Sequence, residues 1–318
     1  MPSYIVRRIL VAIPVLFGIT VITFLIINSL PGSPVDYLVD PRLPAEVKQA
    51  KLEMMGVTGP VWQQYLNWLK NLLQGNLGFS LNDSRPVLDV ILERVGPTLL
   101  LMGSALVVGI VIAIPLGIVS AVKQYSALDY IATGLAFTGI SMPAFFSGLA
   151  LIYLFSVNLK WLPSGGMSSL SGTGGGGAGD VLVHLIMPAC VVAIGVVGQL
   201  IRYVRAGMLR ELDQDYVRTA MAKGVKPPAR IFVHAFRNAL LSIVTVIGMQ
   251  IPSLFCGAVV AEQVFSWPGI GSLMSTAILA RNYPVLMGLI LFSAVVVLLA
   301  NLVTDIVYAV VDPRVRLS

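Results

Sequence analysis

Long runs of apolar residues, separated by shorter polar connections, dominate the chain. A membrane-spanning helix needs about 20 mostly apolar residues, and six stretches meet this requirement. Because backbone groups inside hydrocarbon must bond one another, each stretch is predicted to be a helix. Pro14, Pro115, Pro143 and Pro252 fall within these stretches and are predicted to kink their helices rather than break them. The predicted spans are 9–30, 98–121, 131–157, 183–206, 242–262 and 285–310.

Composition supports an all-α polytopic membrane protein with six transmembrane helices. Of 318 residues, 57% are hydrophobic and only 11% are charged, whereas a soluble domain carries about 25% charged residues. The formal net charge of +6 could indicate a nucleic-acid partner. The basic residues lie in the connections between the spans, however, and there they indicate the orientation of the chain in the membrane.

The distribution of Lys and Arg predicts that both termini are cytoplasmic. Short cytoplasmic connections carry an excess of basic residues. The opposite side has most of its basic residues in one long connection, 31–97, and length weakens the influence of such a loop. The side predicted to be cytoplasmic receives Arg7, Arg8, Lys123, the basic cluster from Arg202 to Arg237, Arg314 and Arg316.

This topology divides the chain into three parts. Residues 1–94 hold the first transmembrane helix and a long extracytoplasmic loop. Residues 95–310 form the transmembrane core and include a cytoplasmic loop, 202–241. Residues 311–318 are a short cytoplasmic tail.

The predicted outer connections contain local structure. "LPAEVKQAKLEMMG" and "VWQQYLNWLKNLL" within 31–97 read as short amphipathic helices. The aromatic residues of the second could dock a partner or rest at the headgroup boundary, where Trp and Tyr are enriched. Residues 262–284 are predicted to form a structured dip at the outer surface, and the Gly- and Ser-rich stretch 164–180 a flexible linker.

The cytoplasmic loop has helix signals that an ordinary solvated basic loop does not need. Asp215 is predicted to cap a helix that starts at Tyr216, and Gly224 to end it in a left-handed conformation. One face of this helix carries small residues, which would let another backbone approach closely. That face consists of Val217, Ala220, Met221 and Gly224.

A second helix is predicted to follow and to continue into the fifth span. Pro227 and Pro228 prevent continuation of the first helix, and the second restarts near Ala229. Its apolar stripe is predicted to be Phe232, Val233, Phe236 and Leu240. The loop would then act as a lever, because force applied to its first helix must move the fifth span.

Several stretches resemble the B-type permease subunit of binding-protein-dependent ABC importers, in the branch that transports dipeptides, oligopeptides, nickel and glutathione. The loop pattern of this family appears as "DYVRTA" at 215–220, "AKG" at 222–224 and "HAFRNA" at 234–239. Further matches are "YIVRRIL", "PGSP", "GNLGFS", "ISMPAFF", "VFSWPGIG" and "NLVTDIVYAVVDPRVR". The chain departs from the branch at Ser33, Ser242 and Asn282, and it has Arg218-Thr219-Ala220 where importers generally have Glu-Ala-Ala.

The resemblance implies a type I ABC importer transmembrane domain in the bacterial cytoplasmic membrane, most simply one for di- or oligopeptides. It implies a second related permease subunit, two cytoplasmic ATPases that bind ATP and Mg²⁺, and an extracytoplasmic solute-binding protein. The chain has no phosphate-binding loop of its own, so the energy for transport must arrive through a partner. No cofactor, catalytic residue or metal site is expected in this chain. The residues implied in ATPase coupling are Asp215, Tyr216, Val217, Arg218, Ala220, Met221, Lys223, Gly224, His234, Arg237 and Asn238.

Other functions fit the sequence less well. An ion-coupled carrier working alone would place ionisable groups near the bilayer midplane, and the spans are nearly free of them. A membrane enzyme would need a catalytic or metal-binding cluster, yet the two histidines, His184 and His234, are predicted at opposite faces. Polar residues within the spans could line a solute path or hydrogen-bond between helices. These are Ser141, Gln199, Thr245, Gln250 and Asn301, together with Asn28.

Overall fold

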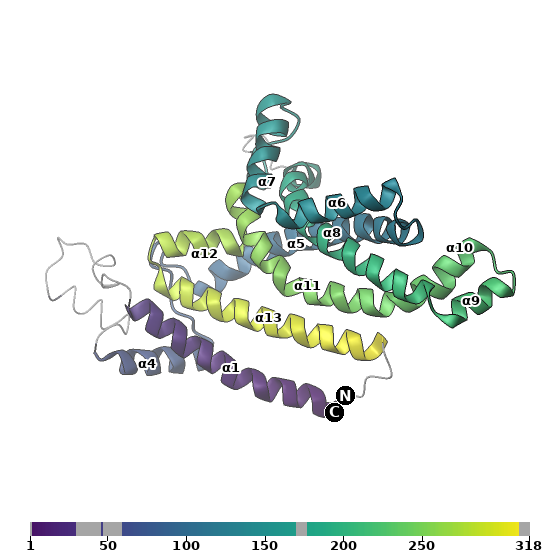
Figure 1. The fold of residues 1–318 in the computed structure, drawn as a ribbon. Helices are drawn as coiled ribbons and strands as arrows, with labels where there is room; N and C mark the ends of the chain where they lie inside the picture. The colour runs from purple at the N-terminus through teal and green to yellow at the C-terminus, as the bar shows by residue number, and fades with distance from the viewer. Residues whose placement is uncertain (1, 30–45, 47–58, 170–176, 312–318) are drawn as a thin grey trace. The chain divides into compact units, whose positions relative to one another are not determined.

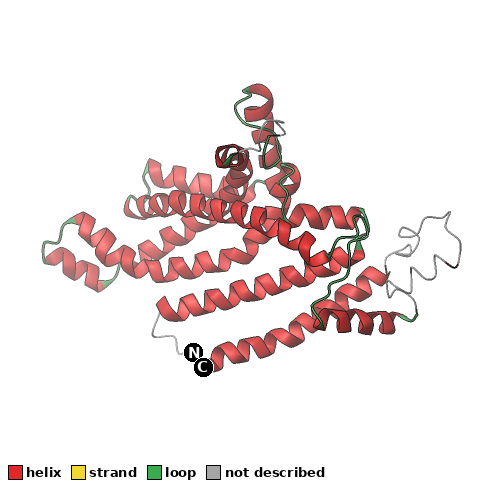
Figure 2. Cartoon of the chain, turned by 180° about the vertical axis from the view of Figure 1, so that it is seen from behind, coloured by secondary structure: helices red, strands yellow, loops and turns green. Residues whose placement is uncertain are grey.

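The computed structural model describes residues 2–29, 46, 59–169 and 177–311. Within these ranges the chain is built from helices joined by turns and short loops (Figures 1 and 2). The amphipathic helix predicted over 43–56 and the tail beyond Val311 lie outside the described residues. The helices are α1 Pro2–Ser29, α4 Val61–Leu73, α5 Val87–Val122, α6 Ala127–Ser141, α7 Ala144–Leu151, η1 Ile152–Asn158, α8 Ala178–Leu212, α9 Asp215–Ala222, α10 Pro227–Ala229, η2 Arg230–Phe236, α11 Arg237–Val264, α12 Ile270–Leu279 and α13 Tyr283–Val311.

Each predicted span corresponds to helical structure. Four helices, α1, α5, α8 and α13, are long and apolar enough to cross a membrane unaided. Two bent segments, α6 to η1 and α10 to α11, bring the number of candidate spans to six. Pro14 and Pro115 lie inside continuous helices.

The prediction for Pro143 was wrong, because the third span is broken rather than kinked. α6 ends at Ser141, and Pro143 precedes α7 in an extended conformation with ψ of 134°. The two halves of the span meet at 104°. Since the residue before a proline avoids helical geometry, Met142 is held extended at ψ 121°.

The chain divides into two compact units, of which the larger comprises 97–268 and 299–318. Its core lies where α5, α6, α8 and α11 pack together, with α8 contacting both α6 and α11 extensively. Small residues dominate this core, as expected where membrane helices pack closely. Its fully buried members include Leu101, Ala105, Ala136, Ala193, Leu200, Ala258, Ala261 and Trp267.

Hydrogen bonds between buried groups stabilise one end of this unit. Thr98 donates a 2.7 Å hydrogen bond to the fully buried carboxyl of Glu262. The Trp267 indole donates to the Pro97 carbonyl at 2.9 Å. Part of the predicted flexible linker is also packed here, because the Gly166 amide donates to the Phe265 carbonyl at 2.7 Å. The linker prediction was therefore wrong for this part; residues 170–176 lie outside the described ranges.

The smaller unit comprises 1–96 and 269–298. Its loop between α4 and α5 folds back on itself, with Phe79 and Pro86 forming an antiparallel bridge. Asn282, buried before α13, holds this loop: its Oδ1 accepts from the Leu81 amide at 3.2 Å and its Nδ2 donates to Ser80 Oγ at 3.0 Å. The departure from the family pattern at this position thus has a structural role. The predicted dip at 262–284 is structured, since α12 forms within it.

Candidate functional site: the loop between α8 and α11

The loop predicted to couple the chain to an ATPase folds as a helical hairpin. We define the α9 hairpin as residues 215–236: α9, the turn after it, α10 and η2. It lies at one end of the larger unit and joins α8 to α11 (Figure 1). Two turn residues, Asp213 and Gln214, separate α8 from α9.

The start of α9 differs from the prediction. Asp215 does not cap the helix; it is the first helical residue, and Gln214 occupies the cap position without a side-chain hydrogen bond. The Asp215 carboxylate is fully exposed, 4.0 Å from the Arg218 guanidinium. An exposed pair of this kind stabilises little. A carboxylate in the first turn is still favourable, because it faces the positive end of the helix dipole.

The end of α9 is confirmed as predicted. Gly224 has φ of +74°, in the left-handed region that glycine adopts at low cost. The Gly224 amide donates to the Met221 carbonyl and the Val225 amide donates to the Ala220 carbonyl, at 3.0 and 3.1 Å. This pair of bonds is the Schellman arrangement, which satisfies the last free carbonyls of a helix and turns the chain sharply.

The second helix begins earlier than predicted, and only part of its predicted apolar stripe is covered. It starts with Pro227, a favoured residue for the first helical position, rather than near Ala229. Of the predicted stripe, Phe232 and Val233 are each 55% exposed, whereas Phe236 and Leu240 are partly buried. The other buried or partly buried positions are Ile231, Ala235, Ala239 and Ile243.

Part of this segment is a π-helix. Residues Arg230–Phe236 form η2, in which hydrogen bonds reach five residues rather than four. The two stripe residues in the middle of η2, Phe232 and Val233, are exposed, and the two at its end and beyond it, Phe236 and Leu240, are partly buried.

The hairpin is joined to three spans through one apolar cluster. Ala235 of η2 and Ala239 and Ile243 of α11 pack with residues of α5 and α8. Those residues are Ile118, Ala121, Val204 and Met208. Because interiors packed in this way transmit displacement rather than absorb it, a movement of the hairpin is passed to α5 and α8 as well as to α11.

An ion pair between buried Asp129 and partly buried Arg205 stabilises this end of the unit. Arg205 of α8 donates two hydrogen bonds to Asp129 of α6, at 2.8 and 2.9 Å. Ser120 of α5 and the Tyr125 amide also donate to that carboxylate. Sequence analysis missed this cluster, because Asp129 lies just before the predicted span 131–157 and Arg205 was assigned to the cytoplasmic basic cluster.

The hairpin divides its predicted coupling residues between two sides. Val217 and Ala220 are each only 7% exposed, because α9 packs on η2. The backbone that approaches the small face of α9 is therefore in the same chain. Met221, predicted for the same face as Val217, is nevertheless 60% exposed, and Arg218, Lys223 and Gly224 are also exposed.

The remaining coupling residues lie near the base of α9. Tyr216 donates a 2.6 Å hydrogen bond to Glu211 of α8. Burial, together with this bond, raises the pKa of Tyr216 above its ordinary value, while a hydrogen bond with Asn238 opposes the change. Tyr216 is therefore neutral and able to donate at physiological pH. His234 is half-buried, and Arg237 and Asn238 are exposed.

The residues proposed to line a solute path are only partly brought together. The Gln250 side-chain amide donates from Nε2 to Gln199 Oε1 at 2.6 Å and so joins α11 to α8, which gives both side chains a structural role. Ser141 lies at the α6–α7 break, Thr245 is half-buried on α11, and Asn301 is exposed on α13. Asn28 donates to the Phe24 carbonyl of its own helix.

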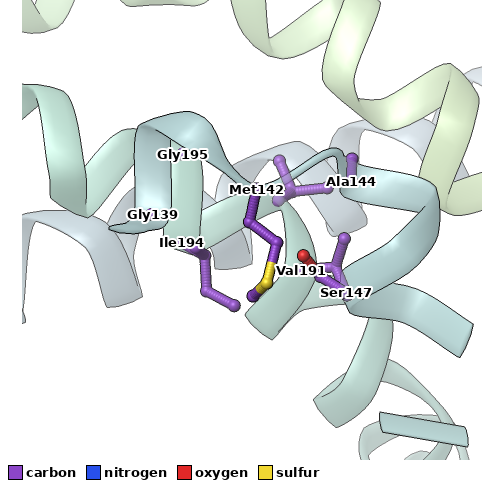
Figure 3. A pocket seen from close by; sticks show the side chains of 8 residues that line it. Gly139, Met142, Ala144, Ser147, Val191, Ile194 and Gly195 are labelled. Atoms are coloured by element: carbon purple, nitrogen blue, oxygen red, sulfur yellow. The ribbon is translucent and has the colours of Figure 1, made fainter. Parts of the chain in front are cut away.

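A small apolar recess of about 100 Å³ lies beside the α6–α7 break, against α8. Figure 3 shows the side chains of Met142, Ser147 and Ile194 around it. The Ser147 hydroxyl donates back to the Pro143 carbonyl. Among the residues that the structure describes, no group of three or more His, Cys, Asp or Glu is placed to hold a metal ion.

The fold and the hairpin define a class of protein: a polytopic transmembrane domain with a helical loop inserted before its fifth span. The same fold occurs in a structure titled as the MetNI methionine ABC transporter in an inward-facing conformation. The TM-score is 0.59 at 16% identity, covering 71% of this chain and 97% of that one. The chain therefore has the transmembrane domain fold of a type I ABC importer.

Family models identify the chain further. Residues 113–317 match the family described as binding-protein-dependent transport system inner membrane component, and residues 1–102 match the N-terminal family of the same systems. The chain belongs to this family and is an integral membrane permease subunit of an ABC transporter.

Similar proteins match over nearly the whole length of the chain. It is 43% identical to the oligopeptide transport system permease protein AppB of Bacillus subtilis, over 99% of this chain and all of that protein. It is 38% identical to the dipeptide transport system permease protein DppB of Escherichia coli, over 99% of both. Identity to the glutathione transport system permease protein GsiC of Escherichia coli is 36%, again over 99% of both chains.

Proposed function

We propose that this subunit forms part of the path by which an ATP-driven importer moves di- or oligopeptides across the bacterial cytoplasmic membrane. The observation that carries the proposal is 43% identity to an oligopeptide permease over 99% of the chain. Of the relatives described above, two are named for peptides and one for glutathione, itself a tripeptide. Their names favour a peptide over nickel.

The energy for transport comes from partners. Two cytoplasmic ABC ATPases bind ATP and Mg²⁺, a second related permease completes the membrane path, and a solute-binding protein delivers peptide from outside. Both termini are cytoplasmic, as is the α9 hairpin, in agreement with the basic residues of that loop. None of the spans supplies a row of ionisable groups suited to proton coupling.

The α9 hairpin is the contact with one ATPase. Its exposed residues, above all Met221 and Arg218, suit the helix-in-groove form of recognition, in which one face of a short helix enters a groove on the partner. Val217 and Ala220 act from the other side, holding α9 on η2. When the ATPases close on ATP, the hairpin moves, and the apolar cluster beneath it turns α5, α8 and α11 together.

Reconstitution tests the transported solute. The complex purified with its coexpressed partners, placed in proteoliposomes with its solute-binding protein, is expected to accumulate labelled di- or oligopeptide when ATP is supplied. Nickel and glutathione serve as competitors. Uptake of nickel without uptake of any peptide would overturn the peptide assignment and leave the family membership intact.

ATP hydrolysis in the separated components tests the division of labour. The purified chain alone is expected to hydrolyse no ATP, and the chain coexpressed with its neighbours is expected to copurify with an ATPase. A chain that transports solute as a stable monomer would contradict this proposal.

A further inference from the structure

Helix α4 presents more apolar surface than the described residues of the chain cover. Its polar residues, Gln63, Asn67, Lys70 and Asn71, occupy one side at helical spacing. The other side is apolar and wide, and α1 covers only one half of it. The uncovered half carries Trp62, Leu66 and Leu73, whose exposed fractions are 64%, 52% and 82%.

The covered half fixes α4 to a spanning helix. Tyr65 packs its ring edge-on against Phe17 and Phe24 of α1, with centroids 6.3 and 5.3 Å away. Its hydroxyl is hydrogen-bonded to Thr20 Oγ1 at 2.9 Å. Trp68 stacks on Tyr65 from the same side. Figure 1 shows α4 beside the C-terminal half of α1.

The position of Thr20 sets the depth of α4. Thr20 precedes the end of α1 at Ser29 by nine residues, or about 13 Å at 1.5 Å per residue. The apolar span Val6–Ser29 is about 36 Å long by the same rise, against about 30 Å of hydrocarbon. Tyr65 is therefore anchored about 10 Å inside the hydrocarbon boundary, a depth at which interfacial helices bury their apolar faces.

We propose that α4 is an in-plane membrane helix, anchored to α1, whose Trp62, Leu66 and Leu73 side chains are covered by lipid acyl chains. Phe17 of α1, which contacts Tyr65 of α4, is itself more than half exposed, as are Ile22 and Leu25 of α1. The only charged residue of α4 is Lys70, whose ammonium group can reach phosphate headgroups from the polar side.

Spin labels on the two sides of α4 test this proposal in the reconstituted complex. Cys190 and Cys256 are first replaced by Ala, and a nitroxide is attached to Leu66→Cys or, as the matched control, to Asn67→Cys on the polar side. Collision rates are measured with oxygen, which concentrates in lipid, and with a water-soluble nickel chelate. The ratio of oxygen to nickel collisions is expected to be several-fold higher at position 66 than at position 67.

Two results would overturn the proposal. Frequent nickel collisions at position 66 would place this surface in water. Low collision rates with both reagents would show that protein, either the second permease or the solute-binding protein, covers it instead. Repeating the measurement without the solute-binding protein tells these two proteins apart. The readout does not depend on transport, so it is independent of the identity of the solute.

Discussion

At the scale of single residues, the most consequential group is the buried carboxylate of Asp129. It accepts hydrogen bonds from α5, from the turn that precedes α6, and from Arg205 of α8, so one side chain ties three spans together. The Arg205 side chain is 29% exposed, so removing the carboxylate leaves a partly solvated charge without its partner, at a cost below the roughly 3 kcal/mol of a fully buried pair. Asp129 therefore stabilises the packing of these three spans, near the end of α8 that leads to the α9 hairpin.

Asp129→Asn is expected to lower the melting temperature of the purified complex clearly, because the Arg205 guanidinium would lose its counter-charge. Thermal unfolding in detergent, followed by tryptophan fluorescence, measures the effect. Asp215→Asn is the matched control: that carboxylate is fully exposed, with only a 4.0 Å contact, so its loss should leave the melting temperature unchanged. Equal melting temperatures for both variants would refute this role of Asp129.

At the scale of elements, glycine decides how closely α6 and α8 approach. A Cβ atom at Gly198 of α8 would lie 2.7 Å from the Ala136 carbonyl oxygen of α6, too close for the backbone to remain in place. Gly195, one turn earlier on the same helix, has nothing within 4 Å of its Cβ position. The two glycines therefore form a natural comparison.

Gly198→Ala is expected to destabilise the complex by about 1–3 kcal/mol, because the added methyl group must push two packed helices apart. Gly195→Ala is expected to be neutral or to stabilise by up to about 1 kcal/mol, since alanine is the better helix former. Melting temperatures of both variants distinguish the two effects. If Gly195→Ala proved as harmful as Gly198→Ala, close approach of α6 and α8 would not explain the requirement for glycine.

The turn after α9 provides a second test at this scale. Gly224 is strained for other residues by its φ of +74°, not by lack of space, because nothing lies within 4 Å of its Cβ position. Gly224→Val should therefore disrupt the turn, and Gly224→Asn should be tolerated, since asparagine enters the left-handed region more readily. Peptide-stimulated ATP hydrolysis by the complex is expected to fall strongly in the first variant and little in the second. Equal losses would show that side-chain size, rather than backbone conformation, matters here.

The sequence predicts some elements of the fold and not others. Apolar length alone locates the spans, and the Gly224 stop is readable because few residues other than glycine adopt its conformation. The exposure of Phe232 and Val233 is not readable, because spacing shows which residues share a face but not which of them α5 and α8 will cover. The Asp129–Arg205 pair also escaped prediction: its members are 76 residues apart, and only packing of α6 on α8 brings them together.

At the scale of the whole molecule, the chain is a permease subunit whose energy source is proposed to lie in its partners. The α9 hairpin is the part of the larger unit that combines an exposed helix face with a rigid connection to several spans. The structure changes one part of the prediction that this loop acts as a lever on the fifth span. The face of α9 with Val217 and Ala220 supports the hairpin from inside, and the face available to a partner is the one with Met221 and Ala222.

Cross-linking from the two faces of α9 in intact membranes tests this assignment most directly. Single cysteines replace Ala222, which is exposed, or Ala220, which is buried against the same chain, and a short thiol cross-linker is added with and without ATP. The account predicts that Ala222→Cys captures an ATP-hydrolysing subunit, with a yield that changes when ATP binds, and that Ala220→Cys captures little. If Ala222→Cys captured no such subunit in an assembled, transport-active complex, the α9 hairpin would not be the site of coupling.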